Sequence, residues 1–114
     1  MDNGFAESEG MRNLKYLLGI DLGTSGTKTV LFEETGRAVA SETIEYPLYQ
    51  PKNGWAEQEP EDWWNAARDT VKAVIAKSGV KPEDVKGVGI SGQMHGLVLL
   101  DREGRVLRRS ILWC

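Results

Sequence analysis

The feature that most constrains the fold is an uninterrupted apolar run that ends on an acid. Residues 16–20 are all apolar or glycine, and Asp21 follows them directly. A run without polar alternation is typical of a strand buried on both faces. We therefore expect a central β-strand here, with a carboxylate at its far end.

Two further strands follow this first strand. A glycine-rich stretch at 23–26 leads to the apolar residues 30–32, and 33–37 (EETGR) is typical of a hairpin turn. Residues 38–46 then form a third strand, which Pro47 ends because proline has no N–H to donate to a ladder. The pattern predicts a three-stranded antiparallel meander.

A helix and a fourth strand are expected next. Acidic residues surround Pro60, which suits a first helical turn, and Gly79 is a natural left-handed terminator. We place the helix at 60–78. Its predicted buried stripe is Trp64, Ala67, Val71, Val74, Ile75 and Ser78. Residues 85–91 alternate apolar residues with glycine, which indicates a strand with close backbone packing.

The remaining residues predict a second hairpin and the start of another strand. Residues 97–100 turn through 101–105 (DREGR) into 106–107, much as the first hairpin does. Ile111–Trp113 is again apolar, and the chain stops at Cys114. Domain boundaries prefer exposed polar linkers, so we expect the chain to be truncated within a domain.

Composition narrows the class of protein. The 114 residues allow one modest domain, and a formal charge of -3 argues against nucleic acid as a partner. A single cysteine, Cys114, and a single histidine, His95, exclude an internal disulfide and a histidine-based zinc site, and favour the cytoplasm. No apolar run approaches the roughly 18 residues of a membrane span. Residues 1–13 are interpreted as a disordered extension.

The first candidate site is Asp21 with the glycine-spaced loop behind it. Gly23 lets backbone N–H groups approach phosphate oxygens, Thr24 and Ser25 add hydroxyl donors, and Lys28 adds a positive charge. Asp21 would hold Mg²⁺, a metal that needs few carboxylates beside phosphate and water. The spacing fits an ordinary glycine-rich hairpin equally well.

The second candidate site is the loop after the predicted fourth strand. Gln93 and His95 supply neutral donors and acceptors for sugar hydroxyls, and Met94 supplies an adaptable apolar wall. On composition alone, a lone histidine between glycines is more often a plain loop residue.

Three tryptophans cluster in a third segment at 55–64. Trp55, Trp63 and Trp64 are candidates for sugar stacking, but anchoring an acidic-capped helix to a sheet explains them better.

These motifs carry a family resemblance that spans residues 14–114. Residues 20–26 (IDLGTSG) resemble the first phosphate loop of the superfamily of sugar kinases, actin and heat-shock chaperones, which implies a ribonuclease-H-like (actin-like ATPase) domain with a mixed sheet. Residues 91–96 (SGQMHG) resemble the xylulokinase group of FGGY carbohydrate kinases, in which the residues matching Met94 and His95 contact the sugar. Glycerol kinases carry charged residues there.

The resemblance implies an ATP- and Mg²⁺-dependent kinase that converts D-xylulose to D-xylulose 5-phosphate. The chain would be the amino-terminal part of its first domain, with the catalytic base and the adenosine site beyond Cys114. The chain alone would then be inactive, and a homodimer of the full protein is left open. Alternatives are a kinase for ribulose or a glycerol-like substrate, an actin-like ATPase, or a non-catalytic binding or assembly module.

Overall fold

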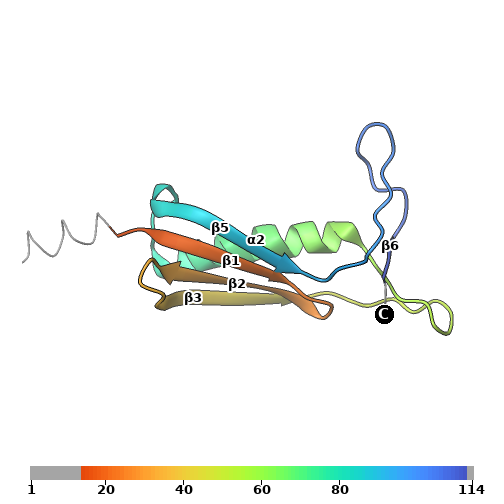
Figure 1. Cartoon of the computed structure of the whole chain (residues 1–114), viewed down its shortest axis with the longest axis horizontal. Coiled ribbons are helices and arrows are strands. Elements are labelled where there is room, and N and C mark those ends of the chain that lie inside the picture. Colours follow the sequence, from red (N-terminus) through yellow and green to blue (C-terminus); the bar gives the residue numbers. More distant parts are fainter. Residues whose placement is uncertain (1–13, 113–114) are drawn as a thin grey trace, which may run out of the picture.

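A mixed four-stranded sheet forms the body of the molecule (Figure 1). The computed structural model describes residues 14–112, so the predicted extension at 1–13 lies outside it, as do Trp113 and Cys114. The strands are β1 (Tyr16–Leu22), β2 (Gly26–Glu33), β3 (Ala38–Glu45) and β5 (Val85–Gly92). Their order is β3-β2-β1-β5, and only β5 runs parallel to its neighbour. The predicted meander and fourth strand are confirmed.

One helix covers one face of this sheet. Helix α2 spans Pro60–Ser78, the predicted bounds, with proline in its first turn. It ends at Gly79, whose φ is 71° and whose N–H donates to the Ile75 carbonyl. A short 3-10 helix, η1 (Pro82–Asp84), leads into β5. Within residues 14–112, no helix is long and apolar enough to cross a membrane.

The core lies between α2 and the sheet, and the predicted stripe is partly wrong. Leu18, Leu31 and Val74 form the buried cluster. Trp64, predicted to be buried, is 65% exposed. Instead Thr70 faces the sheet, where its hydroxyl lies 2.7 Å from the buried hydroxyl of Thr29. A polar residue can occupy this position because both hydroxyls are hydrogen-bonded.

The two predicted hairpin turns share one backbone hydrogen-bond pattern. In the first, the Glu33 N–H donates to the Arg37 carbonyl, and Gly36 has φ 100°. In the second, the Asp101 N–H donates to the Arg105 carbonyl, and Gly104 has φ 84°. Both glycines occupy a left-handed backbone region that disfavours other residues.

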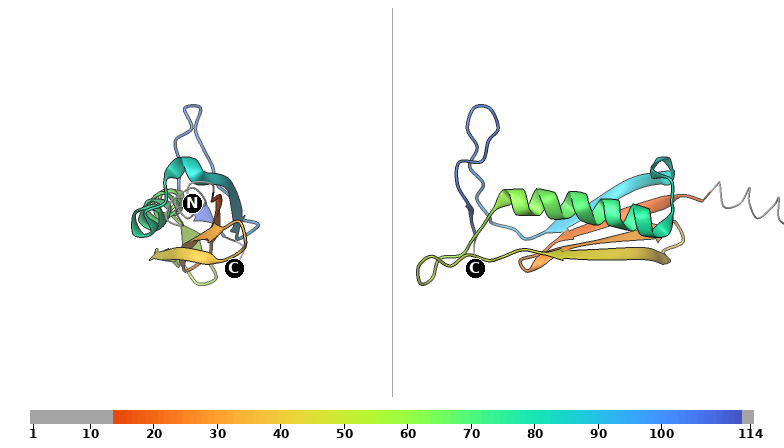
Figure 2. Two further views of the ribbon diagram at one scale, coloured as in Figure 1. Left: turned by 90° about the vertical axis from the view of Figure 1, so that its left-hand side faces the viewer. Right: turned by 180° about the vertical axis from the view of Figure 1, so that it is seen from behind.

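A second, two-stranded sheet lies beyond the end of the main sheet. It pairs β4 (Glu57–Gln58) with β6 (Ser110–Ile111), antiparallel. The sequence predicted the second of these strands from Ile111 onward but not its partner. Figure 2 shows the 97–109 hairpin and the loop before β4 extending past the end of the sheet at which α2 begins. Strand pairing thus brings the last part of the chain beside the start of α2.

Candidate functional site

The two loops predicted to bind ligands emerge at the same edge of the main sheet. Strand β1 ends at Leu22 and β5 at Gly92, and these residues are register partners in a parallel pair. The Gln93 N–H donates to the Leu22 carbonyl, which extends the pairing by one residue. Clefts outside the carboxyl ends of parallel strands are common ligand sites. We call residues 23–26 the phosphate loop and 93–96 the substrate loop.

Asp21 lies exposed on the helix-free face of the sheet. Its Oδ1 accepts a 2.9 Å hydrogen bond from the Ser91 hydroxyl on β5. Lys28 is its register partner on β2, and both line a shallow hollow of about 470 Å³. The hollow is completed by Gly19, Ile20, Val30, Phe32, Gly89, Ile90 and Ser91. A carboxylate, a hydroxyl and an ammonium group here suit a metal-bound phosphate.

The donor set around Asp21 fits Mg²⁺ better than a protein-caged metal. Among the described residues there is no group of three or more His, Cys, Asp or Glu that could hold an ion. Mg²⁺ is commonly bound by one or two carboxylates, retaining water and sharing phosphate oxygens. Asp21 alone therefore supplies enough protein ligand for a metal that arrives with a nucleotide.

The phosphate loop is shaped by contacts from Tyr46, the residue that follows β3. The Tyr46 hydroxyl donates to the Gly23 carbonyl at 2.6 Å, and the Tyr46 N–H donates to the Ser25 carbonyl at 3.2 Å. Within the loop, the Gly23 N–H donates to the Gly26 carbonyl at 2.9 Å. A Cβ on Gly26 would meet the Ile44 carbonyl oxygen at 2.7 Å, so only glycine fits there without a shift. The loop is thus preformed.

Burial raises the pKa of Tyr46 above its ordinary value. The negative charges of Asp21 and Asp62 add to this effect, while a hydrogen bond with the Thr27 hydroxyl opposes it. Desolvation disfavours a phenolate. Tyr46 is therefore held as a neutral donor to the Gly23 carbonyl.

Three side chains join the two loops beneath their surface. The Thr24 hydroxyl donates to Gln93 Oε1 at 3.1 Å, and Gln93 Nε2 donates to Gln58 Oε1 at 3.0 Å. Gln58 Nε2 donates in turn to the Thr24 carbonyl at 2.6 Å. We predicted the Thr24 hydroxyl for a phosphate and Gln93 for the sugar. In the structure these two side chains are hydrogen-bonded to each other.

Gln58 and Tyr46 are site residues that the sequence analysis missed. Gln58 is fully buried, and its Oε1 also accepts from the Trp63 indole N–H at 3.0 Å. The only sequence signal was an uncharged amide among acids just before a helix (E-Q-E-P). Its partners in the two loops, Thr24 and Gln93, lie 34 and 35 positions away along the chain, so local patterns do not reveal them.

The rest of the substrate loop is exposed. Met94 is 70% exposed, and His95 is exposed with a left-handed φ of 65°. A hollow of about 250 Å³ lies beside His95 but is not lined by Met94. Its lining residues are Leu22, Trp63, Gly92, Gln93, His95, Gly96 and Val98. His95 and Asp21 thus line different hollows, although we expected one cleft. Of the three tryptophans, Trp63 contributes to this hollow, whereas Trp55 and Trp64 are exposed elsewhere.

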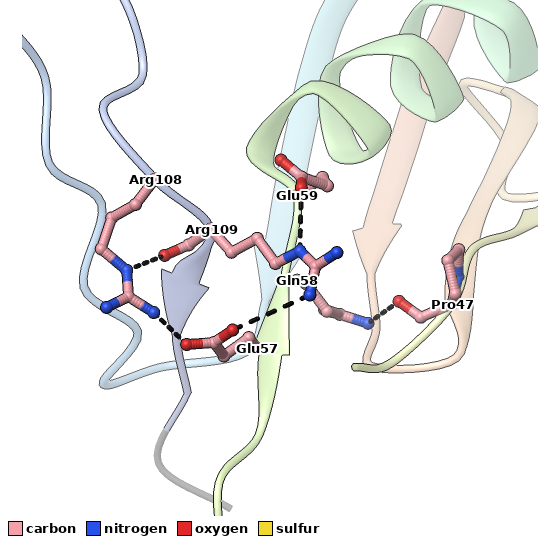
Figure 3. Close-up of polar contacts among 6 residues, drawn as sticks. All are labelled: Pro47, Glu57, Gln58, Glu59, Arg108 and Arg109. Carbon is pink, nitrogen blue, oxygen red and sulfur yellow. Dashed lines mark hydrogen bonds and ion pairs between the residues drawn. The ribbon is translucent and has the colours of Figure 1, made fainter. Parts of the chain in front are cut away.

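An ion-pair cluster fixes β4, and so Gln58, against the later part of the chain. Arg108 and Arg109 both pair with the buried carboxylate of Glu57, and Arg109 also pairs with Glu59 at 3.0 Å. Figure 3 shows Glu57 between the two guanidinium groups while Gln58 points the other way. Neighbouring strand residues alternate in direction, so β4 serves both contacts.

Comparisons with known proteins place this geometry in a family. A model of the N-terminal domain of the FGGY family of carbohydrate kinases matches residues 16–114. The xylulose kinase of Bacillus subtilis is 47% identical over 88% of this chain. A glycerol kinase of Pediococcus pentosaceus is 36% identical over 87%. In each case the chain spans about a fifth of the length of the relative.

A solved structure agrees with these relatives. The crystal structure of a xylulose kinase from Brucella ovis matches 86% of this chain and 21% of its own, with a TM-score of 0.80 and 44% identity. The ribonuclease-H-like (actin-like ATPase) fold class expected from the phosphate loop is thereby confirmed. The chain belongs to the FGGY family of carbohydrate kinases, of whose N-terminal domain it forms part.

Proposed function

We propose that the full-length protein transfers the γ-phosphoryl group of ATP to a ketose, D-xylulose, to give D-xylulose 5-phosphate. The observation that supports this most is the pairing of two motif loops at one sheet edge, Asp21 beneath one and His95 in the other. The choice of D-xylulose is supported by the relatives that are xylulose kinases. An enzyme that consumes ATP would work in the cytoplasm.

Each residue has a distinct part in this proposal. Asp21 holds the metal through water. The N–H groups of Thr24 and Ser25 face the phosphates together with Lys28, whereas the Gly23 N–H is already bonded to the Gly26 carbonyl. Mg²⁺, when bound, spreads the charge that develops on the transferred group. Ser25, exposed at the tip of the loop, adds a hydroxyl donor. Thr24 contributes its backbone, because its hydroxyl is engaged by Gln93.

The sugar would lie in the hollow beside the substrate loop. His95 offers a ring nitrogen to a sugar hydroxyl, and Met94, exposed next to His95 outside the hollow, would pack on any carbon atoms that protrude from it. Trp63 forms part of the hollow wall. The base that accepts the hydroxyl proton would come from a later part of the full-length protein, as would the adenosine site, so the 114-residue chain alone should give no measurable turnover.

A steady-state assay of the full-length protein tests this function. D-xylulose, D-ribulose and glycerol would each be titrated with ATP and Mg²⁺, and ADP release followed. We expect the highest kcat/KM with D-xylulose. A preference for glycerol would favour the relationship to the glycerol kinases, at 36% identity, over that to the xylulose kinases. ATP and sugar binding without any phosphorylation would support a non-catalytic module.

A further inference from the structure

We propose that Gln58 is a positioning residue that couples the phosphate loop to the substrate loop. This inference rests on the proposed kinase function, because it assigns the two loops to the two substrates. Gln58 belongs to neither loop: it lies on β4, before α2, and is fully buried. It hydrogen-bonds to Thr24 of the phosphate loop and to Gln93 of the substrate loop.

The orientation of the Gln58 amide is fixed by its partners. Its Oε1 accepts from the Trp63 indole N–H, which can only donate. Its Nε2 donates to the carbonyls of Thr24 and Pro47, at 2.6 and 3.4 Å, which can only accept. If the amide were flipped, its NH₂ group would face the Trp63 N–H and its oxygen would face the two carbonyl oxygens. Gln58 therefore presents its oxygen toward α2 and Gln93, and its nitrogen toward the phosphate loop.

The bonds between the loops close into a ring. From the Thr24 hydroxyl the bonds run to Gln93, from Gln93 to Gln58, and from Gln58 back to the Thr24 carbonyl. Each bond depends on the position of the other two, and such networks act as a unit. A nucleotide that restrains Thr24 therefore also restrains Gln93 and the loop that follows it.

The contacts of Gln58 point to coupling rather than to support of the core. The buried cluster of Leu18, Leu31 and Val74 is elsewhere. The partners of Gln58 are instead loop carbonyls, Gln93 and Trp63, and the last two line the hollow beside His95. Removing its amide would leave the sheet–helix packing in place, and the bond between the Thr24 hydroxyl and Gln93 would lose the two bonds that support it.

Hydrogen exchange in the full-length protein tests the coupling without requiring that the sugar substrate be known. In the wild type, ADP with Mg²⁺ should slow amide exchange in residues 92–97. In Gln58→Met, which keeps side-chain length but loses both hydrogen-bonding ends, this protection should be lost. The matched control is Gln50→Met, the same change at an exposed glutamine before β4, which should keep it. Protection that persists in Gln58→Met, or is absent from the wild type, overturns the proposal.

Kinetics supply a second, independent readout. Gln58→Met should lower kcat/KM for both substrates by about 10- to 100-fold, as expected for a buried network left unsatisfied. In a double variant, adding Gln93→Met to Gln58→Met should lower kcat/KM little further, because both changes break the same ring. If the losses of the two single variants multiply in the double variant, the proposal is overturned. If Gln58→Met does not fold, Thr24→Val breaks the ring at the Thr24 hydroxyl and decides by the same exchange measurement.

The outcome for the proposed function can be read separately. If the wild type phosphorylates a different acceptor, the substrate assignment fails, whereas the exchange measurement with ADP still reports on coupling. If D-xylulose is phosphorylated but Gln58→Met behaves like Gln50→Met, the function stands and the coupling fails.

Discussion

The phosphate loop and the substrate loop follow neighbouring parallel strands, yet they are held very differently. The phosphate loop is fixed by Tyr46 just after β3, by Gln58 from β4, and by the tight fit of Gly26 against the backbone at Ile44. The substrate loop is held mainly by the side chain of Gln93, which bonds to Thr24 and Gln58. The next two residues of the substrate loop are exposed.

The difference follows from what each loop would bind. A phosphate is recognised by backbone N–H groups, whose positions must be set in advance by the fold. A sugar is recognised by side chains that project into a cleft, so Met94 and His95 need an open side. Changes in the first loop should therefore cost stability or catalysis outright, while changes in the second should mainly weaken sugar binding.

The largest expected effect is at the strand end beneath the phosphate loop. In the full-length protein, Asp21→Ala should lower kcat by about 1,000-fold or more, since a metal at the phosphates is worth several kcal/mol. The fold should survive because Asp21 is exposed. Asp69→Ala, at an exposed helix acid, is the control for losing a surface carboxylate. Retained activity in Asp21→Ala would remove this residue from the mechanism.

A matched pair of glycine changes tests the difference in packing. Gly26→Ala places a Cβ 2.7 Å from the Ile44 carbonyl oxygen and 3.0 Å from the Glu45 Cα, and backbone cannot move cheaply. It should destabilise the protein by about 3 kcal/mol. Gly96→Ala meets only ordinary contacts, the nearest at 3.5 Å, and should stay within about 0.5 kcal/mol. Denaturant unfolding measures both, and equal losses would mean that the loops are equally constrained.

A smaller effect should separate the two substrates. His95→Asn keeps a residue type that tolerates the left-handed backbone but shortens the side chain. It should raise KM for D-xylulose by about 10-fold and leave KM for ATP unchanged. Lys28→Met should raise KM for ATP by about 10-fold and leave KM for D-xylulose unchanged, because it removes a positive charge near the phosphates. The assignment of the loops is wrong if both variants shift the same KM.

The elements of the fold were largely readable from local patterns. The bounds of α2 followed from Pro60 and Gly79, and both hairpins from a glycine placed where φ must be positive. The existence of β5 followed from its alternation of apolar residues with glycine. Each of these signals depends on a few neighbouring residues, which is why the sequence suffices.

The network beneath the site was not readable in this way. A stripe predicted from apolarity placed Trp64 inside and missed Thr70, because a hydroxyl pair made a polar residue suitable for the core. Gln58 looked like a solvated residue of an acidic segment, whereas contacts with Thr24 and Gln93 bury it. The roles of Thr70 and Gln58 depend on hydrogen-bond partners that are distant in the sequence. A single sequence does not show which distant residues come into contact.

The smallest expected effect concerns Tyr46 at alkaline pH. Its pKa is raised in the folded protein, chiefly by burial, above the ordinary value of 10.0. The folded state thus holds the phenolic proton more firmly than the unfolded chain. The stability from this difference is fully present below pH 10 and is lost as the pH rises through the folded pKa.

Because Tyr46→Phe has no such proton, its free energy of unfolding should fall less steeply above pH 10 than that of the wild type. Denaturant unfolding of both proteins between neutral and alkaline pH measures the two slopes, and lysine titration cancels between them. Parallel slopes would show that Tyr46 is not held neutral by the fold, and the phosphate loop would then lose the preset donor that distinguishes it from the substrate loop.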